Sequence, residues 1–191
     1  MANIILASQS PRRRELLEKM GIRDFSIVVP DAEETLVEGL SPQETVESIS
    51  RQKSEAAAAM VGAEDIVITA DTMVFLGGEK LGKPRDEADA FRMLRALSGK
   101  RHEVCTGVTV RQGGKIETFS VTTGVYFRET TDDELLAYIA SGEPMDKAGS
   151  YGVQGLGCLI VERIDGDYYN VMGLPVERLG RVLGHFGVKL L

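Results

Sequence analysis

Hydrophobic and polar positions along the chain switch between strand-like and helix-like spacing. Apolar runs or period-two alternation predict strands, whereas apolar residues three and four positions apart predict helices. The predicted strands are residues 3–7, 26–29, 66–70, 103–111, 115–128, 158–164 and 167–172. The predicted helices are residues 11–20, 42–60, 86–97, 131–140 and a last helix that opens at Pro175. This succession predicts an α/β fold with a mixed, elongated sheet, flanking helices and two lobes around a cleft.

Turn and capping residues support these boundaries. The segments Ser41–Glu44 and Thr131–Glu134 each have the pattern of a capping box at a helix start. Gly113-Gly114 and Asp165-Gly166 are two-residue turn signals, and each predicts a hairpin between the strands that flank it. The sequence shows no internal repeat and no long linker. We therefore expect residues 1–191 to form a single domain with two lobes around a central cleft.

Composition narrows the class of protein. With 191 residues, 43% hydrophobic and 27% charged, the chain is typical of a globular protein with a sizeable core. Its formal net charge of −7 argues against a general nucleic-acid partner. Cys105 and Cys158 lie in apolar, strand-like runs, which predicts two buried thiols in a reducing compartment. The sequence has no secretion signal and no apolar run of membrane length, so we expect a cytoplasmic protein without a membrane partner.

Three arginines, Arg12–Arg14, lie in the first turn of a predicted helix that Ser10 caps and Pro11 begins. Cations are unfavourable at this end of a helix by roughly 0.3–1 kcal/mol each when exposed, whereas its free N–H groups bind anions. Arginine forks also grip phosphate oxygens at two points. The residues alone leave two interpretations open, namely a phosphate site or a solvated basic patch balanced by nearby glutamates.

Two charged residues lie where apolar ones are expected. Asp71 follows the buried run 66–70 and is predicted to lie at the carboxyl end of that strand, where open α/β sheets bind ligands. It is a candidate to bind a metal or activate water, with a turn or cap aspartate as the alternative. Lys53 falls on the apolar face of helix 42–60. Either its stem snorkels to water or its ammonium meets an anion in a cleft.

Glycine-containing segments carry the remaining candidates. Lys83, between Gly82 and Pro84, is either a surface-turn lysine or a further phosphate ligand near the arginines. Segment 149–157 contains four glycines, which suits a backbone that wraps closely around a ligand or a flexible connection between strands. Gln154 in that segment offers a donor and an acceptor, as the edge of a nucleobase requires. Together these groups predict a pocket for a nucleoside triphosphate with Mg²⁺.

A series of short motifs runs from the first strand to the last helix. In chain order they are Leu6–Arg13, Glu33-Glu34, Lys53, Ala70–Thr72, Gly82–Pro84, Leu97–Gly99, Asp146–Gly155 and Val171–Pro175. In this order they resemble the Maf family of nucleoside triphosphate pyrophosphatases over nearly the whole chain. The resemblance implies a fold like that of inosine triphosphate pyrophosphatases. It also implies hydrolysis of a nucleoside triphosphate to the monophosphate and pyrophosphate with Mg²⁺ or Mn²⁺, by proteins that are often homodimers.

The resemblance implies roles for individual residues as well. Asp71 is similar to the family's catalytic aspartate, described as the proton acceptor, and Glu34 to its acidic partner for the metal, with Glu33 as the alternative. The implied triphosphate-binding set is Ser8, Arg12, Arg13, Lys53 and Lys83. The subgroups of the family differ in the base they accept. At the distinguishing positions this chain has Arg12, Thr72 and Gln154, as in the dTTP/UTP-hydrolysing subgroup, and not the Trp, Gln and Glu of the 7-methyl-GTP subgroup.

The expected activity is therefore hydrolysis of dTTP and UTP, with CTP and modified pyrimidine nucleotides as further candidates. The alternative is a non-catalytic nucleotide-binding regulator, because family members have been linked to inhibition of septum formation. A pure binder does not need an aspartate placed to activate water, which favours the enzyme. Release of pyrophosphate from a panel of nucleotides distinguishes the two.

Overall fold

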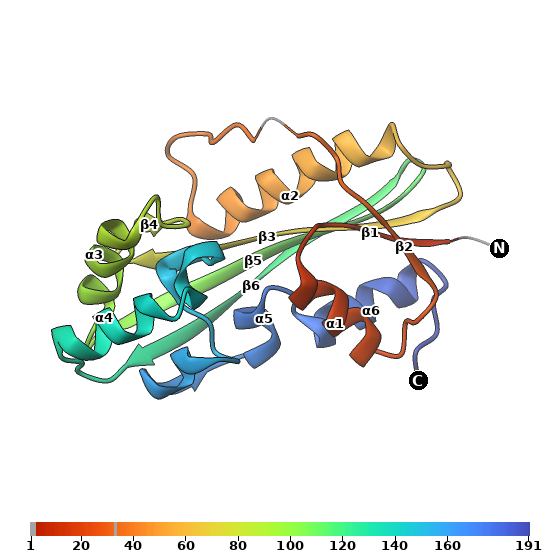
Figure 1. Ribbon diagram of the computed structural model, residues 1–191. Coiled ribbons are helices and arrows are strands. Elements are labelled where there is room, and N and C mark those ends of the chain that lie inside the picture. The colour runs from red at the N-terminus through yellow and green to blue at the C-terminus, as the bar shows by residue number, and fades with distance from the viewer. Residues whose placement is uncertain (1–2, 33) are drawn as a thin grey trace. The chain divides into compact units, whose positions relative to one another are not determined.

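A computed structural model describes residues 3–32 and 34–191, and these residues form a seven-stranded mixed sheet (Figure 1). The strand order is β2-β1-β3-β5-β6-β7, and β4 pairs with β3 off this path. β1 is parallel to both β2 and β3, whereas β4 on β3 and β7 on β6 are antiparallel. The strands are β1 Ile4–Ala7, β2 Phe25–Val28, β3 Ile66–Leu76, β4 Glu79–Leu81, β5 Arg101–Gln112, β6 Lys115–Phe127 and β7 Val161–Asp165. The predicted mixed α/β class is confirmed.

The helices begin at the predicted caps. Ser10 accepts a hydrogen bond from the Arg13 backbone N–H, and both predicted capping boxes, at Ser41 and at Thr131, are formed. The α-helices are α1 Pro11–Lys19, α2 Pro42–Ala58, α3 Glu87–Leu97, α4 Asp132–Ala140, α5 Tyr168–Met172 and α6 Val176–His185. Short 3₁₀ segments are η1 Glu143–Asp146, η2 Ala148–Ser150 and η3 Leu156–Leu159. No helix in the described part of the chain is long and apolar enough to cross a membrane.

The described residues divide into two compact units. The first unit comprises Met1–Asp71, Thr106–Val121 and Gly173–Leu191, and the second comprises Thr72–Cys105 and Thr122–Met172. β3, β5 and β6 each contribute residues to both units.

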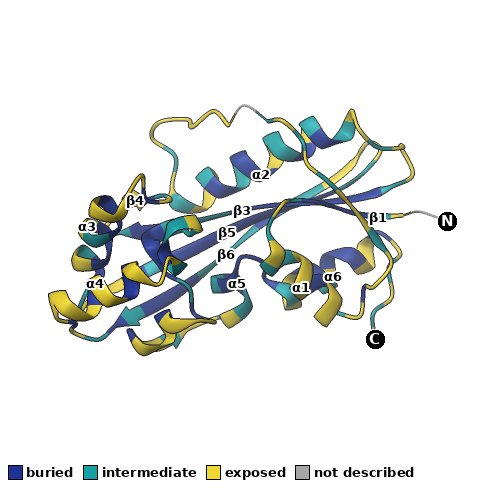
Figure 2. Ribbon diagram, viewed as in Figure 1, coloured by how far each residue is buried: buried dark blue, intermediate teal, exposed yellow. Residues whose placement is uncertain are grey.

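In the first unit, α2 covers the sheet through an unusually close contact. A Cβ added to Gly107 of β5 would overlap the backbone of Val46 in α2, so only glycine permits this approach. Hydroxyl groups join α2 to the sheet nearby. Ser50 of α2 hydrogen-bonds Thr109 of β5 at 2.9 Å, and the Thr69 hydroxyl of β3 donates to the Ser50 carbonyl at 2.7 Å. Figure 2 shows α2 as a mixture of buried and half-buried residues with few exposed ones. This contact fixes the height of α2 above the strands.

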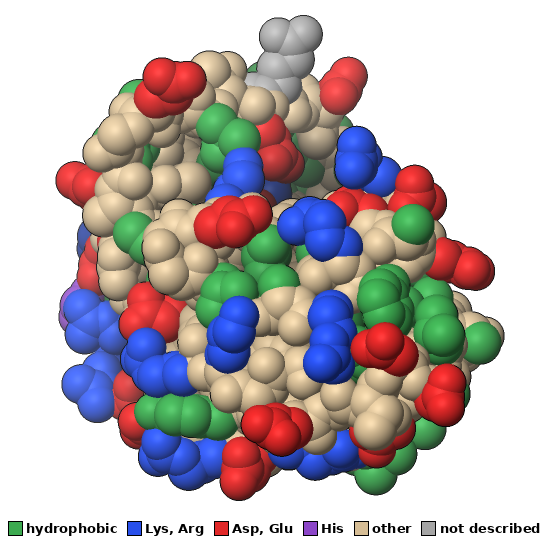
Figure 3. Space-filling view, turned by 90° about the vertical axis from the view of Figure 1, so that its left-hand side faces the viewer, with side chains coloured by type: hydrophobic (Ala, Val, Ile, Leu, Met, Phe, Trp, Pro, Cys, Tyr) green, Lys and Arg blue, Asp and Glu red, His purple; other side chains and the backbone are tan. Residues whose placement is uncertain are grey.

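In the second unit, α3 and α4 pack against each other, and an aromatic cluster forms part of the core. His102, Phe127 and Tyr151 meet edge to face, with ring centroids 4.7–5.3 Å apart. The His102 Nε2 atom lies 2.7 Å from the Tyr151 hydroxyl. Exposed charges of both signs lie side by side over the face shown in Figure 3.

The prediction of a strand at 167–172 is wrong, and with it the predicted hairpin at Asp165-Gly166. β7 ends at Asp165, and residues 168–172 form the short helix α5. The Asp167 carboxylate accepts hydrogen bonds from the backbone N–H groups of Tyr169 and Asn170, which starts a helical turn. Asn170 is then buried, and its amide donates to the Val104 carbonyl and the Thr123 hydroxyl at 3.0 Å each. These contacts outweigh the strand preference of the tyrosines and Val171.

The predicted strand 158–164 is shorter than expected, because β7 starts at Val161 and residues 156–159 form η3. This overturns the expectation for Cys158, which lies in η3 with its side chain exposed. Cys105 is buried in β5, as predicted. Its thiol contacts the Thr122 hydroxyl at 3.2 Å, and burial raises its pKa.

Candidate active site

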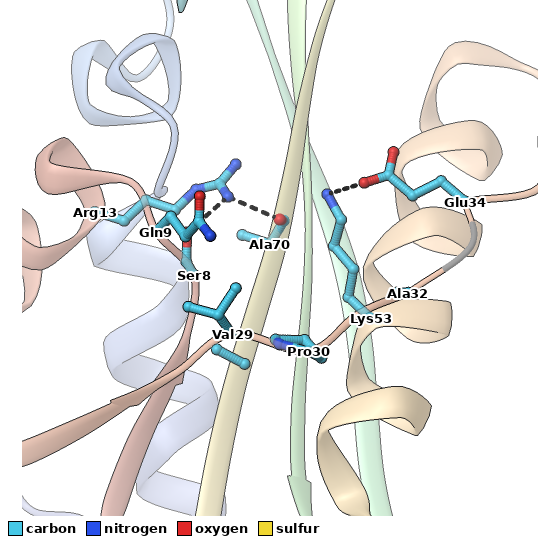
Figure 4. Close-up of a pocket in the computed structure, with 10 residues that line it drawn as sticks. Ser8, Gln9, Arg13, Val29, Pro30, Ala32, Glu34, Lys53 and Ala70 are labelled. Atoms are coloured by element: carbon cyan, nitrogen blue, oxygen red, sulfur yellow. Dashed lines mark hydrogen bonds and ion pairs between the residues drawn. The ribbon is translucent and has the colours of Figure 1, made fainter. Parts of the chain in front are cut away.

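A pocket of about 270 Å³ lies within the first unit, at the ends of its parallel strands. β1 ends at Ala7 opposite the end of β2 at Val28, and β3 runs beside β1 up to the Leu6–Ile68 pair. The segments that follow these paired ends surround the pocket, as expected at the carboxyl edge of parallel strands. Figure 4 shows the lining residues: Ala7, Ser8, Gln9, Arg13, Val29, Pro30, Ala32, Glu34, Lys53 and Ala70.

Asp71 lies inside β3 and not at its end, which corrects the prediction. β3 continues to Leu76, with β5 as its neighbour in the sheet and with β4 paired to it from Val74 to Leu76. The pairing with β1 nevertheless stops at Ile68, so Asp71 lies beyond the end of its parallel neighbour. The functional expectation depended on Asp71 lying past the end of a parallel neighbour, and this holds. The Asp71 carboxylate forms an ion pair with Lys53, which lines the pocket.

Lys53 of α2 bridges two carboxylates of the first unit. Its Nζ atom lies 2.7 Å from Asp71 Oδ1 and 3.0 Å from Glu34 Oε1 (Figure 4). The side chains of Lys53 and Asp71 are only 19% and 12% exposed, so solvent screens their ion pair weakly. Of the two possibilities left open by the sequence, the lysine meets anions, and they come from its own chain.

Arg13 forms the opposite wall of the pocket. Its Nε donates to the Gly173 carbonyl and its Nη1 to the Ala70 carbonyl, each at 2.8 Å, and Nη1 also lies 3.3 Å from the Ser8 hydroxyl. Burial lowers the pKa of Arg13, while the negative charge of Asp71 acts in the opposite direction. The guanidinium therefore ties the start of α1 to the residue before Asp71 and places a partly buried positive charge at the pocket.

Glu34 is held in place by a contact that the sequence did not reveal. Gln52 precedes Lys53 in α2, and its side-chain amide pairs with the backbone of Thr35: Oε1 accepts from the N–H and Nε2 donates to the carbonyl, each at 2.9 Å. These two hydrogen bonds fasten the irregular segment after β2 to α2 beside Lys53. Glu33, the alternative metal ligand, lies outside the described residues.

The other predicted site residues lie elsewhere. Arg12 is half-buried on α1 and does not line the pocket. Three candidates belong to the second unit: Thr72 is half-buried in β3, Lys83 is exposed between β4 and α3, and Gln154 is exposed in the glycine-rich segment. The first unit thus brings together Ser8, Arg13, Glu34, Lys53 and Asp71. Sequence reasoning missed Gln52 and the Gly173 carbonyl, since neither a lone glutamine nor a backbone oxygen carries a motif.

The carboxylates fit a divalent cation. Asp71 Oδ2 is buried and has no hydrogen-bond partner among the described residues, so this carboxylate oxygen is an unsatisfied acceptor that a cation would satisfy. No group of three or more His, Cys, Asp or Glu side chains that could hold a metal comes together within residues 3–32 and 34–191. Mg²⁺ is usually bound by one or two carboxylates together with waters and substrate phosphates, and Asp71 with Glu34 matches that pattern.

Comparison with known proteins decides the family. The family described as "Maf-like protein" matches residues 3–186. The chain belongs to the Maf family. A relative from Bacillus velezensis, named dTTP/UTP pyrophosphatase, is 48% identical over 186 residues, covering 97% of this chain and 97% of the relative. A relative of the same name from Vibrio cholerae is 50% identical over 186 residues, covering 97% of this chain and 99% of the relative.

A solved structure shows the fold of this Maf chain in a more distant protein. The structure of a HAM1 protein from Coxiella burnetii matches with a TM-score of 0.53 and 14% sequence identity, covering 97% of this chain and 100% of that one. At this identity the likeness concerns the fold alone. Within that fold, the arrangement of Arg13, Lys53 and two carboxylates places charges of both signs around one pocket, which suits a phosphate chain bound with a cation.

Proposed function

We propose that this protein is a nucleoside triphosphate pyrophosphatase that hydrolyses dTTP and UTP to the monophosphate and pyrophosphate. The observation that carries the proposal is the Lys53 bridge between Asp71 and Glu34, at a pocket that Arg13 also lines. Full-length relatives of about 50% identity that are named dTTP/UTP pyrophosphatase support the choice of substrate. CTP and modified pyrimidine nucleotides are further candidates for the substrate.

The proposed reaction is attack of water on the α-phosphorus. A bond forms between the water oxygen and that phosphorus, and the bond from the α-phosphorus to the bridging oxygen breaks, so pyrophosphate leaves. In the proposed reaction the Asp71 carboxylate accepts a proton from the attacking water. The absence of a hydrogen-bond partner for its Oδ2 among the described residues supports this role. The positive charges of Lys53 and Arg13 stabilise the negative charge that moves onto the leaving group.

A divalent cation, Mg²⁺ or Mn²⁺, is part of the proposal, with Asp71 and Glu34 as its ligands. When bound, such an ion neutralises phosphate charge and lowers the pKa of water. Lys53 pairs with both carboxylates in the present arrangement, so its positive charge offsets their mutual repulsion. We assign Ser8, Arg12, Arg13, Lys53 and Lys83 to the triphosphate.

Base selection is assigned to Arg12, Thr72 and Gln154. A single domain with two lobes around a central nucleotide cleft, a homodimer and a cytoplasmic location also remain predictions. Changing Gln154→Glu removes the amide donor and adds a charge, so the preference for dTTP over GTP should fall several-fold, by about 1 kcal/mol. An unchanged ratio of kcat/KM for the two nucleotides would remove Gln154 from base selection.

The decisive test of the activity is Asp71→Asn, which keeps the shape of the side chain and removes its basicity. Loss of a general base typically costs about 10²–10⁴ in rate, so release of pyrophosphate from dTTP should become nearly undetectable. Asp24→Asn, at an exposed carboxylate of the same unit, should retain wild-type rates. Binding of dTTP by the wild-type protein without release of pyrophosphate from any nucleotide would contradict the proposal and favour a nucleotide-binding regulator.

A further inference from the structure

The glycine-rich segment Gly152–Gly157 of the second unit is anchored at both of its ends by side chains. At its start, the Gly152 N–H donates to the Tyr138 hydroxyl at 3.1 Å. At its end, the N–H groups of Leu156 and Gly157 donate to the Glu143 carboxylate at 2.7 and 3.2 Å. The Tyr138 hydroxyl in turn donates to Glu143 Oε1 at 2.8 Å, so the two anchors are joined. We call Tyr138 and Glu143 together the clamp.

Two glycines at the end of this segment lie against the clamp. A Cβ on Gly155 would overlap the Glu143 carboxylate, and a Cβ on Gly157 would overlap the Gly152 carbonyl oxygen and lie 2.8 Å from the Tyr138 hydroxyl oxygen. Side chains at these positions are therefore incompatible with the observed contacts. The sequence left open whether this backbone wraps closely around a ligand or is a flexible connection, and in the structure it packs closely on groups of its own chain, the two clamp side chains among them.

The clamp is itself held rigidly. Tyr138 is buried at the end of α4 and is only 5% exposed. The Glu143 backbone N–H donates to the Ser141 hydroxyl, and its carbonyl accepts from Lys147 Nζ at 2.6 Å. Burial acts to raise the pKa of Glu143, but the hydrogen bonds from Tyr138, Leu156 and Gly157 prevail and lower it. A charged acceptor is thus fixed under the segment.

The residues between the two anchors include Gln154, which is exposed. We infer that Glu143 is a positioning residue for base selection: its carboxylate, joined to Tyr138, holds the backbone of Gly152–Gly157 in the conformation that presents Gln154 to the nucleobase. The inference rests on the proposed function, because it requires a nucleotide substrate. It goes beyond that function by assigning specificity to two side chains that need not touch the substrate.

The test compares Glu143→Gln with Glu162→Gln, the same change at an exposed carboxylate of the second unit. In Glu143→Gln one acceptor oxygen becomes an NH₂ donor, so at least one backbone N–H of the segment loses its partner. We expect the KM for dTTP to rise about tenfold with kcat within about twofold, and the preference for dTTP over GTP to fall. Amide hydrogen exchange at Leu156 and Gly157 should become faster, whereas Glu162→Gln should match the wild type.

Tyr138→Phe removes the hydroxyl that links the two anchors and keeps the ring, so it provides a second variant if Glu143→Gln does not fold. It should shift KM and nucleotide preference in the same direction. Unchanged KM and preference in both variants would overturn the inference while leaving the proposed function intact. An equal loss with dTTP and GTP would assign the clamp a merely structural role and would also overturn it. A wild-type protein that hydrolyses no nucleoside triphosphate would overturn the proposed function itself.

Discussion

Neighbouring arginines in the first turn of α1 have different surroundings. Arg13 points into the first unit and donates to the backbone carbonyls of Ala70 and Gly173. Arg14 is exposed and forms a one-turn ion pair with Glu18 at 3.1 Å. A cation at the start of a helix opposes the macrodipole, and the carbonyl oxygens around Arg13 offset that cost. The same residue type therefore gives a pocket group at one position and a solvated surface group at the next.

The two arginines provide a matched pair of substitutions. Arg13→Lys replaces a planar fork by a single ammonium, which cannot span the Gly173 and Ala70 carbonyls together. Loss of about 3 kcal/mol of hydrogen bonding to a charged group should reduce kcat/KM for dTTP on the order of 100-fold. Arg14→Lys should remain within about twofold of the wild type. The measurement is the rate of pyrophosphate release, and equal effects of the two changes would contradict the assignment.

Among the elements, α2 does most to organise the pocket. It supplies Lys53 to the carboxylates and Gln52 to the segment that carries Glu34. Its height above the sheet depends on the backbone contact between Gly107 and Val46, since no side chain separates them. Buried residues of α2, β1 and β3 pack behind the pocket, with Ala57 against Ile5, Ala7 and Val67. Packing of this kind transmits a small shift of the helix to the charged end of Lys53.

Gly107→Ala tests this dependence. The added methyl group meets backbone atoms, which cannot move aside, so α2 must shift at a cost of about 1–3 kcal/mol in the free energy of unfolding. Urea denaturation measures this cost. Gly114→Ala, in the turn after the same strand, meets nothing within 4 Å and should change stability by less than about 0.5 kcal/mol. A stable Gly107→Ala protein with wild-type activity would show that α2 is free to move.

For the molecule as a whole, buried His102 links stability to pH. Burial, and to a smaller extent the charge of Arg101, lowers the pKa of His102 from 6.5 to about 4. Its Nδ1 atom is buried without a hydrogen-bond partner among the described residues, so a proton there is unfavourable. Below pH 6.5 the unfolded chain binds a proton that the folded protein does not. Stability is therefore lost as the pH falls from 6.5 towards 4.

The expected contribution of His102 to this loss is about 3 kcal/mol between pH 7 and pH 4. Denaturant unfolding at the two pH values measures it. His102→Gln, which does not titrate, should show a smaller loss than the wild type by that amount, whatever its stability at pH 7. His185→Gln, at the exposed histidine of the first unit, should lose as much stability between pH 7 and pH 4 as the wild type. Identical pH dependence in His102→Gln would contradict the prediction.

The local sequence determined where most of the helices and strands begin and end. The caps at Ser10, Ser41 and Thr131 and the turn at Gly113-Gly114 lie where the sequence predicts, because their hydrogen bonds and backbone angles involve residues only a few positions apart. The charged candidates Arg13 and Lys53 were likewise visible as violations of local preference. Motif order was sufficient to indicate the family.

Tertiary structure alone decided what depends on distant partners. β3 continues past Asp71 beside two strands that come later in the chain, β4 and β5. α5 replaced a predicted strand because Asn170 finds buried partners in β5 and β6. The pairing of Lys53 with Asp71 and Glu34 joins residues 18 and 19 positions away, on separate elements. The need for glycine at Gly155 and Gly157 became visible only from their neighbours in the fold, which include Glu143 and Tyr138. Such contacts depend on the three-dimensional approach of segments, which residue spacing along the chain does not encode.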